Sequence, residues 1–386
     1  MAEERKQPEL RFKGFTDDWI QDKLHELTVI NSGKDYKNLS EGHIPVYGTG
    51  GYMLSVNKSL SDIDAVGLGR KGTIDNPIYL KAPFWTVDTL FYITTQQQNN
   101  IMFFYYLFKT INWKKYNEAS GVPSLSKQTI YSISVKVPNT FEQSKISKLF
   151  YSLDRIITLE QQKIEKLELL KQYLLQNMFA DESGYPRVRF KGYNNKWERS
   201  KLNTISDSYS GLSGKTKEDF GKGEARYIEY KNVFDNPVAK LDGTDAIDID
   251  YKQNEVKKGD FLFTTSSETP EEVGMSSLWD YDLNNIYLNS FCFGVRIKEK
   301  IDSYYLAYYF RSPEFRSRVM KLAQGISRYN ISKNKFCELK ISVPSYEEGV
   351  RIGRLLKSTT DLIDLEENKL KEFKLIKSKL LQSLFI

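Results

Sequence analysis

Two long stretches of the chain carry hydrophobic residues at helical spacing. In the first, leucine, isoleucine and methionine recur at intervals of three, four and seven residues between charged positions, which is typical of an amphipathic helix. No proline falls between Pro138 and Pro186, so nothing there interrupts a helix. The end of the chain repeats the pattern. We therefore predict two long helices, at 141–180 and 346–386.

The apolar positions of the two helices form matching narrow stripes. A helix of about 35 to 40 residues is roughly 50–60 Å long, and a long helix with a narrow stripe needs a partner helix for stability. We expect the stripes to pair antiparallel within one chain, as an intramolecular coiled coil. The alternative is a parallel coil between two copies, used only for dimerisation. The positions expected at the contact are Leu153, Ile157, Ile164, Leu167, Leu174, Leu362, Ile363, Leu370, Phe373 and Leu380.

The sequence around these helices occurs twice. Residues 11–24, RFKGFTDDWIQDKL, return 178 positions later at 189–202 as RFKGYNNKWERSKL. Residues 135–150 return at an offset of 206, at 341–356. Because the second offset is longer by 28, the second copy has extra residues in its interior. One module of domain size is therefore present twice, with matched ends and unlike interiors.

Each module combines short strands with short helices. Hydrophobic runs such as 77–93 and 259–265 alternate with glycine, asparagine and aspartate turns. We predict an α+β chain with a pseudo-two-fold internal repeat, in which two α/β modules are separated by two long antiparallel helices. The expected segments are a first module at 1–140, a spacer helix at 141–184, a second module at 185–345 and a second spacer helix at 346–386.

Composition narrows the class of protein only modestly. The net charge is +6, and Lys and Arg outnumber Asp and Glu by 16 to 14 over 1–140 and by 26 to 22 over 185–344. This excess permits a polyanionic partner without requiring one. Cys292 and Cys337 are the only cysteines, which excludes a disulfide scaffold. With no visible signal peptide and no apolar run of membrane-spanning length, we expect a soluble, cytoplasmic protein without membrane contact.

Motifs that would form an active site are incomplete. Two histidines, His25 and His43, and two distant cysteines leave no credible zinc site or histidine-based triad. SGLSGKT (210–216) resembles a phosphate-binding loop but has two residues instead of four between its glycines. DNPIY (75–79) lacks the second proline of an amino-methyltransferase pocket, and ELK (338–340) lacks the Pro-Asp pair of a nuclease site. We conclude that the chain has no active site and binds no metal or cofactor itself.

The chain resembles the specificity subunit of type I restriction–modification enzymes over nearly all of its 386 residues. The resemblance rests on the RFKGF and RFKGY module starts and on the helix entries VPNTFEQSKISKLF (137–150) and VPSYEEGVRIGRLL (343–356). The helix ends LLQNMF (174–179) and LLQSLF (380–385) belong to it too. One departure is Glu347-Glu348-Gly349, where the family has Glu-Gln. We expect this glycine and Gly353 to fray the start of the second helix.

The resemblance implies a division of labour. Each module would be a target-recognition domain that reads one half of a split double-stranded DNA site, with the half-sites roughly one helical turn, ~34 Å, apart. The helices would act as a ruler and as the docking surface for two methyltransferase (modification) subunits, with one copy of this chain per complex. Those subunits would bring S-adenosylmethionine, and restriction/translocase subunits would bring ATP and Mg. Two alternatives stay open: a self-contained DNA-modifying or DNA-cleaving enzyme with a cryptic site, and a coiled-coil adaptor without DNA readout.

Polar loops between the predicted strands contain the candidate DNA-binding residues. Base edges are read by side chains with forked donors or acceptors, and phosphates are bound by Lys, Arg, hydroxyls or backbone amides. For each residue the alternative is an ordinary turn or solvated surface; Arg328, in a Gly-Ile-Ser-Arg-Tyr-Asn loop, is the strongest candidate. The candidates are Lys34, Tyr47, Thr49, Arg70, Lys71 and Ser124 in the first module, and Lys215, Lys217, Ser266, Ser267, Glu268, Thr269, Arg328, Tyr329 and Asn330 in the second.

Overall fold

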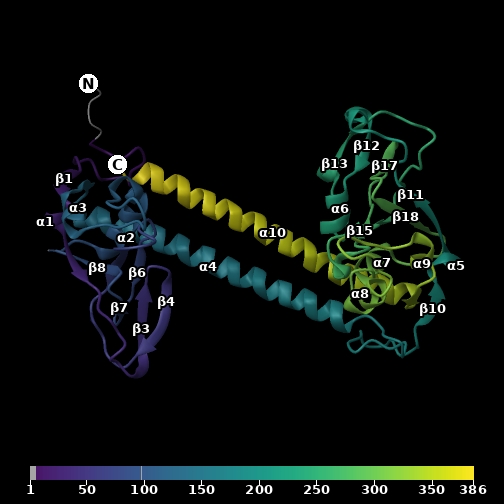
Figure 1. Cartoon of the computed structure of the whole chain (residues 1–386), viewed down its shortest axis with the longest axis horizontal. Helices are drawn as coiled ribbons and strands as arrows, with labels where there is room; N and C mark the ends of the chain where they lie inside the picture. Colours follow the sequence, from purple (N-terminus) through teal and green to yellow (C-terminus); the bar gives the residue numbers. More distant parts are fainter. Residues whose placement is uncertain (1–5, 97) are drawn as a thin grey trace. The chain divides into compact units, whose positions relative to one another are not determined.

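The computed structural model describes residues 6–96 and 98–386 (Figure 1). The chain folds as two compact units. The first unit comprises Met1–Gln161 with Asn368–Ile386, and the second comprises Gln162–Glu367. Each unit therefore contains one of the repeated modules together with part of each long helix.

The two predicted long helices are present and unbroken. They are α4 (Thr140–Asn177) and α10 (Tyr346–Leu384), each drawn as a single continuous helix in Figure 1. Within the first unit they run antiparallel, because Lys377 of α10 contacts Asp154 while Lys369, earlier on α10, contacts Glu160, later on α4. The predicted antiparallel pairing within one chain is thus confirmed.

Ion pairs along the helices reproduce the sequence repeat. In the first unit the Lys369 Nζ lies 2.8 Å from Glu160 Oε1. In the second unit the Lys163 Nζ lies 2.7 Å from Glu366 Oε1. Each residue of one pair stands 206 positions from its counterpart in the other, which is the offset of the helix-entry motif. The helices therefore carry the same contact twice, with the roles of α4 and α10 exchanged.

The described residues of the first module form three small sheets. A two-stranded sheet pairs β1 with β9 at the ends of the module, an antiparallel sheet has the order β2-β8-β5-β6, and a third sheet, with β7 parallel to β3, has the order β4-β3-β7. The strands are β1 (Ile20–Lys23), β2 (Thr28–Ser32), β3 (Glu41–Gly48), β4 (Gly51–Val56), β5 (Ala65–Gly69), β6 (Ile78–Leu80), β7 (Trp85–Thr86), β8 (Leu90–Thr95) and β9 (Ser134–Val137). The short helices are α1 (Leu24–Leu27), α2 (Ile101–Thr110) and α3 (Lys127–Ser132), with a 3-10 turn, η1 (Trp113–Tyr116).

The second module repeats this topology. Its sheets have the orders β10-β20, β11-β18-β14-β16 and β13-β12-β17, and it adds a short pair, β15-β19. The strands are β10 (Glu198–Lys201), β11 (Ser206–Ser210), β12 (Phe220–Ile228), β13 (Thr244–Ile247), β14 (Phe261–Thr264), β15 (Ser266–Ser267), β16 (Ser276–Leu278), β17 (Ile286–Leu288), β18 (Cys292–Ile297), β19 (Tyr329–Asn330) and β20 (Lys340–Val343). The short helices are α5 (Leu202–Ile205), α6 (Tyr230–Asp235), α7 (Ser303–Tyr309), α8 (Pro313–Met320) and α9 (Lys333–Cys337), with 3-10 turns η2 (Lys217–Asp219), η3 (Leu241–Gly243) and η4 (Pro270–Glu272).

The strand register preserves both sequence offsets. Ile20 pairs with Val137 in the first module, and Glu198 pairs with Val343 in the second. The first residues of these pairs stand 178 positions apart and the second residues 206. Much of the extra length enters between β12 and β13, where the second module inserts α6 in place of the short β3–β4 turn. The frame of the module is therefore constant while its loops differ.

The repeated LLQ motif ends each long helix inside a module core. In the first unit the Phe385 ring lies 5.3 Å from that of Phe103 and 5.9 Å from that of Phe150. In the second unit the ring of Phe179, two residues after the end of α4, lies 5.5 Å from that of Tyr305 between centroids. Each module core is thus closed by the end of a long helix, which explains why this motif is repeated.

The expectation that glycines fray the start of α10 is wrong. The helix begins at Tyr346 and includes both Gly349 and Gly353. A Cβ atom on Gly353 would lie 2.3 Å from the Asp302 Oδ1 and 2.6 Å from the Tyr305 backbone nitrogen. The glycine therefore lets the N-terminus of α7 pack directly against α10, and this tertiary contact outweighs its low helix propensity.

Candidate nucleic-acid interface

Loops of the first module meet at one end of its four-stranded sheet. The loop after β5 pairs with the loop before α3 through the Lys71–Ser124 bridge, and the Leu125 amide donates to the Arg70 carbonyl at 2.9 Å. The Arg70 amide in turn donates to the Thr89 carbonyl at 2.8 Å. Three predicted site residues, Arg70, Lys71 and Ser124, thus line one hollow of about 400 Å³.

The other three candidates of the first module are tied to the same region. The Lys34 amide donates to the Thr86 carbonyl at 2.8 Å, and the Val87 amide donates to the Tyr47 carbonyl at 3.0 Å. Thr49 lies beside the Arg70–Gly72 loop, since a Cβ on Gly72 would be 3.7 Å from its Oγ1. We define this group of six candidates, Lys34, Tyr47, Thr49, Arg70, Lys71 and Ser124, as the first loop cluster.

The charges of the first loop cluster are available for a ligand. Arg70 and Lys71 are exposed, and neither forms an ion pair with any residue that the structure describes. The Arg70 guanidinium lies 6.0 Å from the centre of the Phe91 ring. The nearby carboxylate of Glu118 is engaged, because it accepts hydrogen bonds from Thr129 and from the Ser126 amide, which lowers its pKa. The lowered pKa keeps Glu118 negatively charged, but the lining of the hollow holds Arg70, Lys71 and Lys127 against this one carboxylate, so its net charge is positive.

The second module builds a corresponding cluster around β15 and β19. Ser266 pairs with Asn330, and Ser267 with Tyr329, in the place that the Lys71–Ser124 bridge holds in the first module. The Arg328 guanidinium lies 5.7 Å from the centre of the Phe291 ring. We define the residues of this pairing and its flanks, Ser266, Ser267, Glu268, Thr269, Arg328, Tyr329 and Asn330, as the second loop cluster.

A pocket opens beside the second loop cluster. It has a volume of about 560 Å³, and Arg328 and Glu268 are exposed in its lining. Ser266 and Ser267 are buried: the Tyr230 hydroxyl donates to the Ser266 carbonyl at 2.6 Å, and the Ser267 hydroxyl donates to the Thr269 carbonyl. The serines hold the loop in shape, which leaves the charged side chains exposed. The pocket is lined by Tyr230, Phe234, Ser267, Glu268, Glu272, Ser327 and Arg328.

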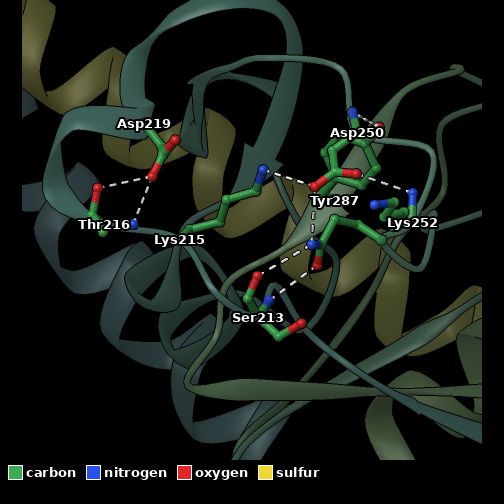
Figure 2. A network of polar contacts seen from close by, with 8 residues as sticks. Ser213, Lys215, Thr216, Asp219, Asp250, Lys252 and Tyr287 are labelled. Atoms are coloured by element: carbon green, nitrogen blue, oxygen red, sulfur yellow. Dashed lines mark hydrogen bonds and ion pairs between the residues drawn. The ribbon is translucent and has the colours of Figure 1, made fainter.

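Lys215 and Lys217 lie on a different loop. Ser213 and Lys215 of this loop contact residues 250–253 (Figure 2). The Lys215 Nζ lies 2.8 Å from the Asp250 Oδ2, and this hydrogen bond raises the pKa of the lysine. Together with hydrogen bonds from the Lys252 amide and Gln253, it lowers the pKa of Asp250 to about 2. Gln253 bonds both the Ser213 backbone and Asp250. Lys215 is thus committed to a loop contact, whereas Lys217 is exposed on η2.

The aromatic side chains that contact the two loop clusters were not predicted from the sequence. Phe91 and Phe291 lie beneath the arginines, and Tyr230 supports the second loop. Lys127 was missed too; its Nζ lies 5.9 Å from the centre of the Phe91 ring. No sequence signal separates these aromatic residues from the core aromatics, because their role depends on which loop folds over them.

The residues predicted at the helix–helix contact lie at different depths. Leu362 is 37% exposed, because the neighbouring Ile363 takes the inward position. Its counterpart on α4, Ile156, is equally exposed. The buried positions are Ile157, Ile164, Leu174 and Ile363, and the half-buried ones are Leu153, Leu167, Leu370, Phe373 and Leu380.

Residues 6–96 and 98–386 contain neither a cluster of metal-binding side chains nor a membrane-spanning helix. No group of three or more His, Cys, Asp or Glu side chains there could hold a metal ion. None of the helices in that part of the chain is both long and apolar enough to span a membrane.

The sequence matches the family model described as the type I restriction modification DNA specificity domain, over residues 16–169 and again over 194–375. The two matches correspond to the two repeated modules with their helices. Together they cover well over half of the chain.

Individual proteins are similar to this chain at lower identity. The type I restriction enzyme MjaVIII specificity subunit of Methanocaldococcus jannaschii is 24% identical over 294 residues, which span 72% of this chain and 68% of that protein. The crystal structure of a type I restriction-modification S subunit from M. genitalium aligns with a TM-score of 0.67 at 14% identity, covering 98% of this chain and 99% of that one. A chain from a structural study of complex assembly in the type I system aligns with a TM-score of 0.52 at 14% identity, covering 95% and 97%.

Proposed function

The chain belongs to the family of type I restriction modification DNA specificity domains, and on that premise we propose that its two modules read the two halves of one DNA site. A specificity subunit supplies sequence recognition and performs no catalysis. The domain assignment that we propose is 1–140 and 185–345 as target-recognition domains, with 141–184 and 346–386 as spacer helices.

The observation that carries this proposal is the pair of loop clusters. Both lie at the same place in a constant frame, and each presents an exposed arginine beside an aromatic ring, Arg70 near Phe91 and Arg328 near Phe291. A guanidinium fork suits the paired acceptors of a guanine edge, and lysines suit phosphates. Because the other residues of the clusters differ, the two half-sites should be unlike.

We propose further that the long helices dock two methyltransferase (modification) subunits. Apolar side chains remain exposed on both helices at positions 206 apart: Leu159 (57%) and Leu365 (61%), and Leu169 (60%) and Leu375 (54%). Apolar surface of this kind favours a protein partner. In the first unit the set consists of Leu159 and Leu375, and in the second of Leu169 and Leu365, so each unit offers an equivalent surface to one copy of the same partner.

The remaining components follow from the family. S-adenosylmethionine would be bound by the methyltransferase subunits, and ATP and Mg by restriction/translocase subunits, in a cytoplasmic complex with one copy of this chain. Since α4 and α10 are continuous helices joining the modules, the DNA site should consist of two short half-sites around a fixed number of unread bases.

Mapping methyladenine in the genome of a host that expresses the chain with its partner subunits tests this function. We expect a bipartite motif, methylated on both strands, that disappears when the chain is deleted. A continuous palindrome, or a gap of freely varying length, would contradict the proposal. Turnover of DNA by the purified chain alone would favour a self-contained enzyme, and no chain-dependent methylation would favour an adaptor.

A further inference from the structure

The most exposed aliphatic side chain of the second module stands at the tip of the loop that carries Arg328 of the second loop cluster. Ile326 is 96% exposed, between Gly325 and the Ser327–Arg328 pair. The matching loop of the first module has Val122 after Gly121, and Val122 is 66% exposed. Both modules therefore place a β-branched aliphatic residue in solvent at the same point, although their interiors differ elsewhere.

The loop that carries Ile326 is held in shape at its base. Gln324 and Asn330 exchange two backbone hydrogen bonds, at 2.9 and 2.8 Å. Gly325 has a φ of +139°, and a Cβ atom on it would lie 2.0 Å from the Arg328 carbonyl oxygen. Glycine is therefore required there, and the tight turn projects the next side chain outward.

The loop that carries Val122 is fixed by different contacts. The Asn117 Oδ1 accepts hydrogen bonds from the Ser124 amide at 2.9 Å and from the Ala119 amide at 3.2 Å. The Gly72 amide donates to the Pro123 carbonyl at 2.9 Å, which joins this loop to the one that carries Arg70 and Lys71. Two unlike sets of contacts thus produce the same exposed aliphatic tip, which points to a use for the side chain outside the fold.

The surroundings of the tips favour DNA as the partner. Arg328 follows Ile326 by two residues, and Arg70 and Lys71 lie across the strand bridge from the loop of Val122. In the major groove, the apolar group that a base edge offers is the 5-methyl group of thymine, and aliphatic side chains read it by contact. Resting on the proposed function, we propose that Ile326 and Val122 are specificity-determining residues that each contact a thymine methyl group, one in each half-site.

The first test is a change in the methylated motif in cells. Methyladenine is mapped in hosts that express the full chain with its partner subunits, as wild type, Ile326→Ala or Val122→Ala. We expect each substitution to relax one A·T position, in a different half-site for each variant. Ile63→Ala is the matched control, because Ile63 is also an exposed aliphatic residue (63%) but lies outside both clusters; its motif should equal that of the wild type.

The second test isolates the methyl group itself. Binding of the complex is measured on duplexes in which each thymine of the mapped half-sites is replaced in turn by uracil, which lacks only the 5-methyl group. When uracil replaces thymine at the contacted position, the affinity of the wild type should fall about 10-fold. This is the lower end of the effect that removing one carbon has in an apolar contact. Ile326→Ala should be insensitive to that replacement, and Ile326→Val should retain most of the wild-type preference.

The outcomes separate the inference from the function on which it rests. If no methylation depends on the chain, the proposed function is wrong. If the motif is bipartite but Ile326→Ala and the uracil duplexes change nothing, only the thymine contact is wrong. If Ile326→Ala weakens binding to the thymine duplex and to the uracil duplex by the same factor relative to the wild type, the preference for thymine persists without the side chain. That result would indicate a wedge between base pairs and would also overturn the inference. Because the side chain is exposed, the melting temperature of Ile326→Ala should match the wild type.

Discussion

Arg189 donates two hydrogen bonds to Glu348, from Nε to Oε1 at 2.7 Å and from Nη2 to Oε2 at 2.9 Å. Glu348 is 1% exposed and stands in the first turn of α10. Arg11 makes the same two-point contact with Glu142 in the first turn of α4, with both distances 2.8 Å. These residues come from the two repeated motifs, so the matched ends of the module join each module to the helix that follows it.

Removing either arginine should destabilise the protein strongly. Arg11→Ala leaves the Glu142 carboxylate buried without its partner, a change that typically costs about 3–5 kcal/mol. Arg189→Ala should cost less, because the Trp197 Nε1 also donates to Glu348 at 3.0 Å, whereas the equivalent Trp19 Nε1 makes no such bond. Urea denaturation, monitored by hydrogen exchange of the amides in each unit, measures the loss in the free energy of unfolding for Arg11→Ala and for Arg189→Ala.

Arg155→Ala is the control for this pair, because Arg155 is an exposed arginine on α4. Its free energy of unfolding should stay within about 0.5 kcal/mol of the wild type. A larger loss in Arg189→Ala than in Arg11→Ala would contradict the role assigned to Trp197.

The helices and the doubled frame could be predicted from sequence because their signals are local or repeat along the chain. The three- and four-residue spacing predicts each helix, and the offsets of 178 and 206 reappear as the register of β1-β9 and β10-β20. The fraying expected at Gly353 was wrong because helix propensity carries no information about Asp302, which packs there.

The site could be predicted less well because its geometry depends on contacts between distant loops. The residue type of Lys215 suits a phosphate, yet its partner is Asp250, 35 positions away. Arg328 and Phe291 likewise meet only in the folded module. Residue type therefore identified candidate side chains, whereas which of them stay free for a ligand was decided by tertiary structure.

Each exposed arginine of the loop clusters should control one position of one half-site. Losing a guanidinium group that donates two hydrogen bonds to a base costs about 1–3 kcal/mol in binding free energy and relaxes specificity at that position. We expect Arg70→Ala to act on the half-site of the first module and Arg328→Ala on that of the second, measured by methyladenine mapping and by binding to single-position duplex variants. If both variants leave affinity and motif unchanged, these residues do not read DNA.

Lysine at the same positions separates base reading from simple charge. Arg70→Lys and Arg328→Lys keep a positive charge but lose the forked donor geometry. We expect them to retain binding to non-specific DNA, with its steep salt dependence, while losing discrimination at the affected position. Full discrimination in the lysine variants would assign the arginines to phosphate contacts.

The Lys215–Asp250 contact should weaken in acid. Hydrogen bonds from Lys215, from the Lys252 amide and from Gln253 together lower the pKa of Asp250 from 3.8 to about 2. A carboxylate with a depressed folded-state pKa stabilises the fold above its unfolded pKa, and this contribution is lost as the pH falls from about 4 to about 2. Hydrogen exchange, corrected for intrinsic rates, should show falling protection at the Ser213 and Lys252 amides over that range.

The control for the acid effect is Asp250→Asn, which has no carboxylate to titrate. In that variant the loop contact loses its charge, so the Ser213 amide should already be less protected than in the wild type at pH 6. The Lys252 amide can still donate to the asparagine oxygen, and the protection of both amides should change little down to pH 2, relative to amides of β14. An unchanged acid dependence in Asp250→Asn would assign the loss of protection to another carboxylate.

A charge on the exposed apolar positions of the long helices should prevent methyltransferase docking without unfolding the chain. Leu169 and Leu375 are 60% and 54% exposed and correspond to each other in the repeat. Placing a glutamate there costs little in the isolated chain, because the side chain stays in water, but it buries a charge in the complex. We expect Leu169→Glu and Leu375→Glu each to remove one of two methyltransferase subunits, and the double variant to remove both.

Light scattering of the purified assembly measures the stoichiometry directly. The wild type should contain one copy of this chain and two methyltransferase subunits, and each single variant should contain one of each. The matched control is Lys145→Glu, an exposed charge change on α4 fourteen residues before Leu159, which should keep both subunits. If the double variant still binds two methyltransferase subunits, Leu169 and Leu375 are not part of the docking surface. Two copies of this chain in the wild-type complex would contradict the single-copy assembly, since α4 and α10 pair within one chain.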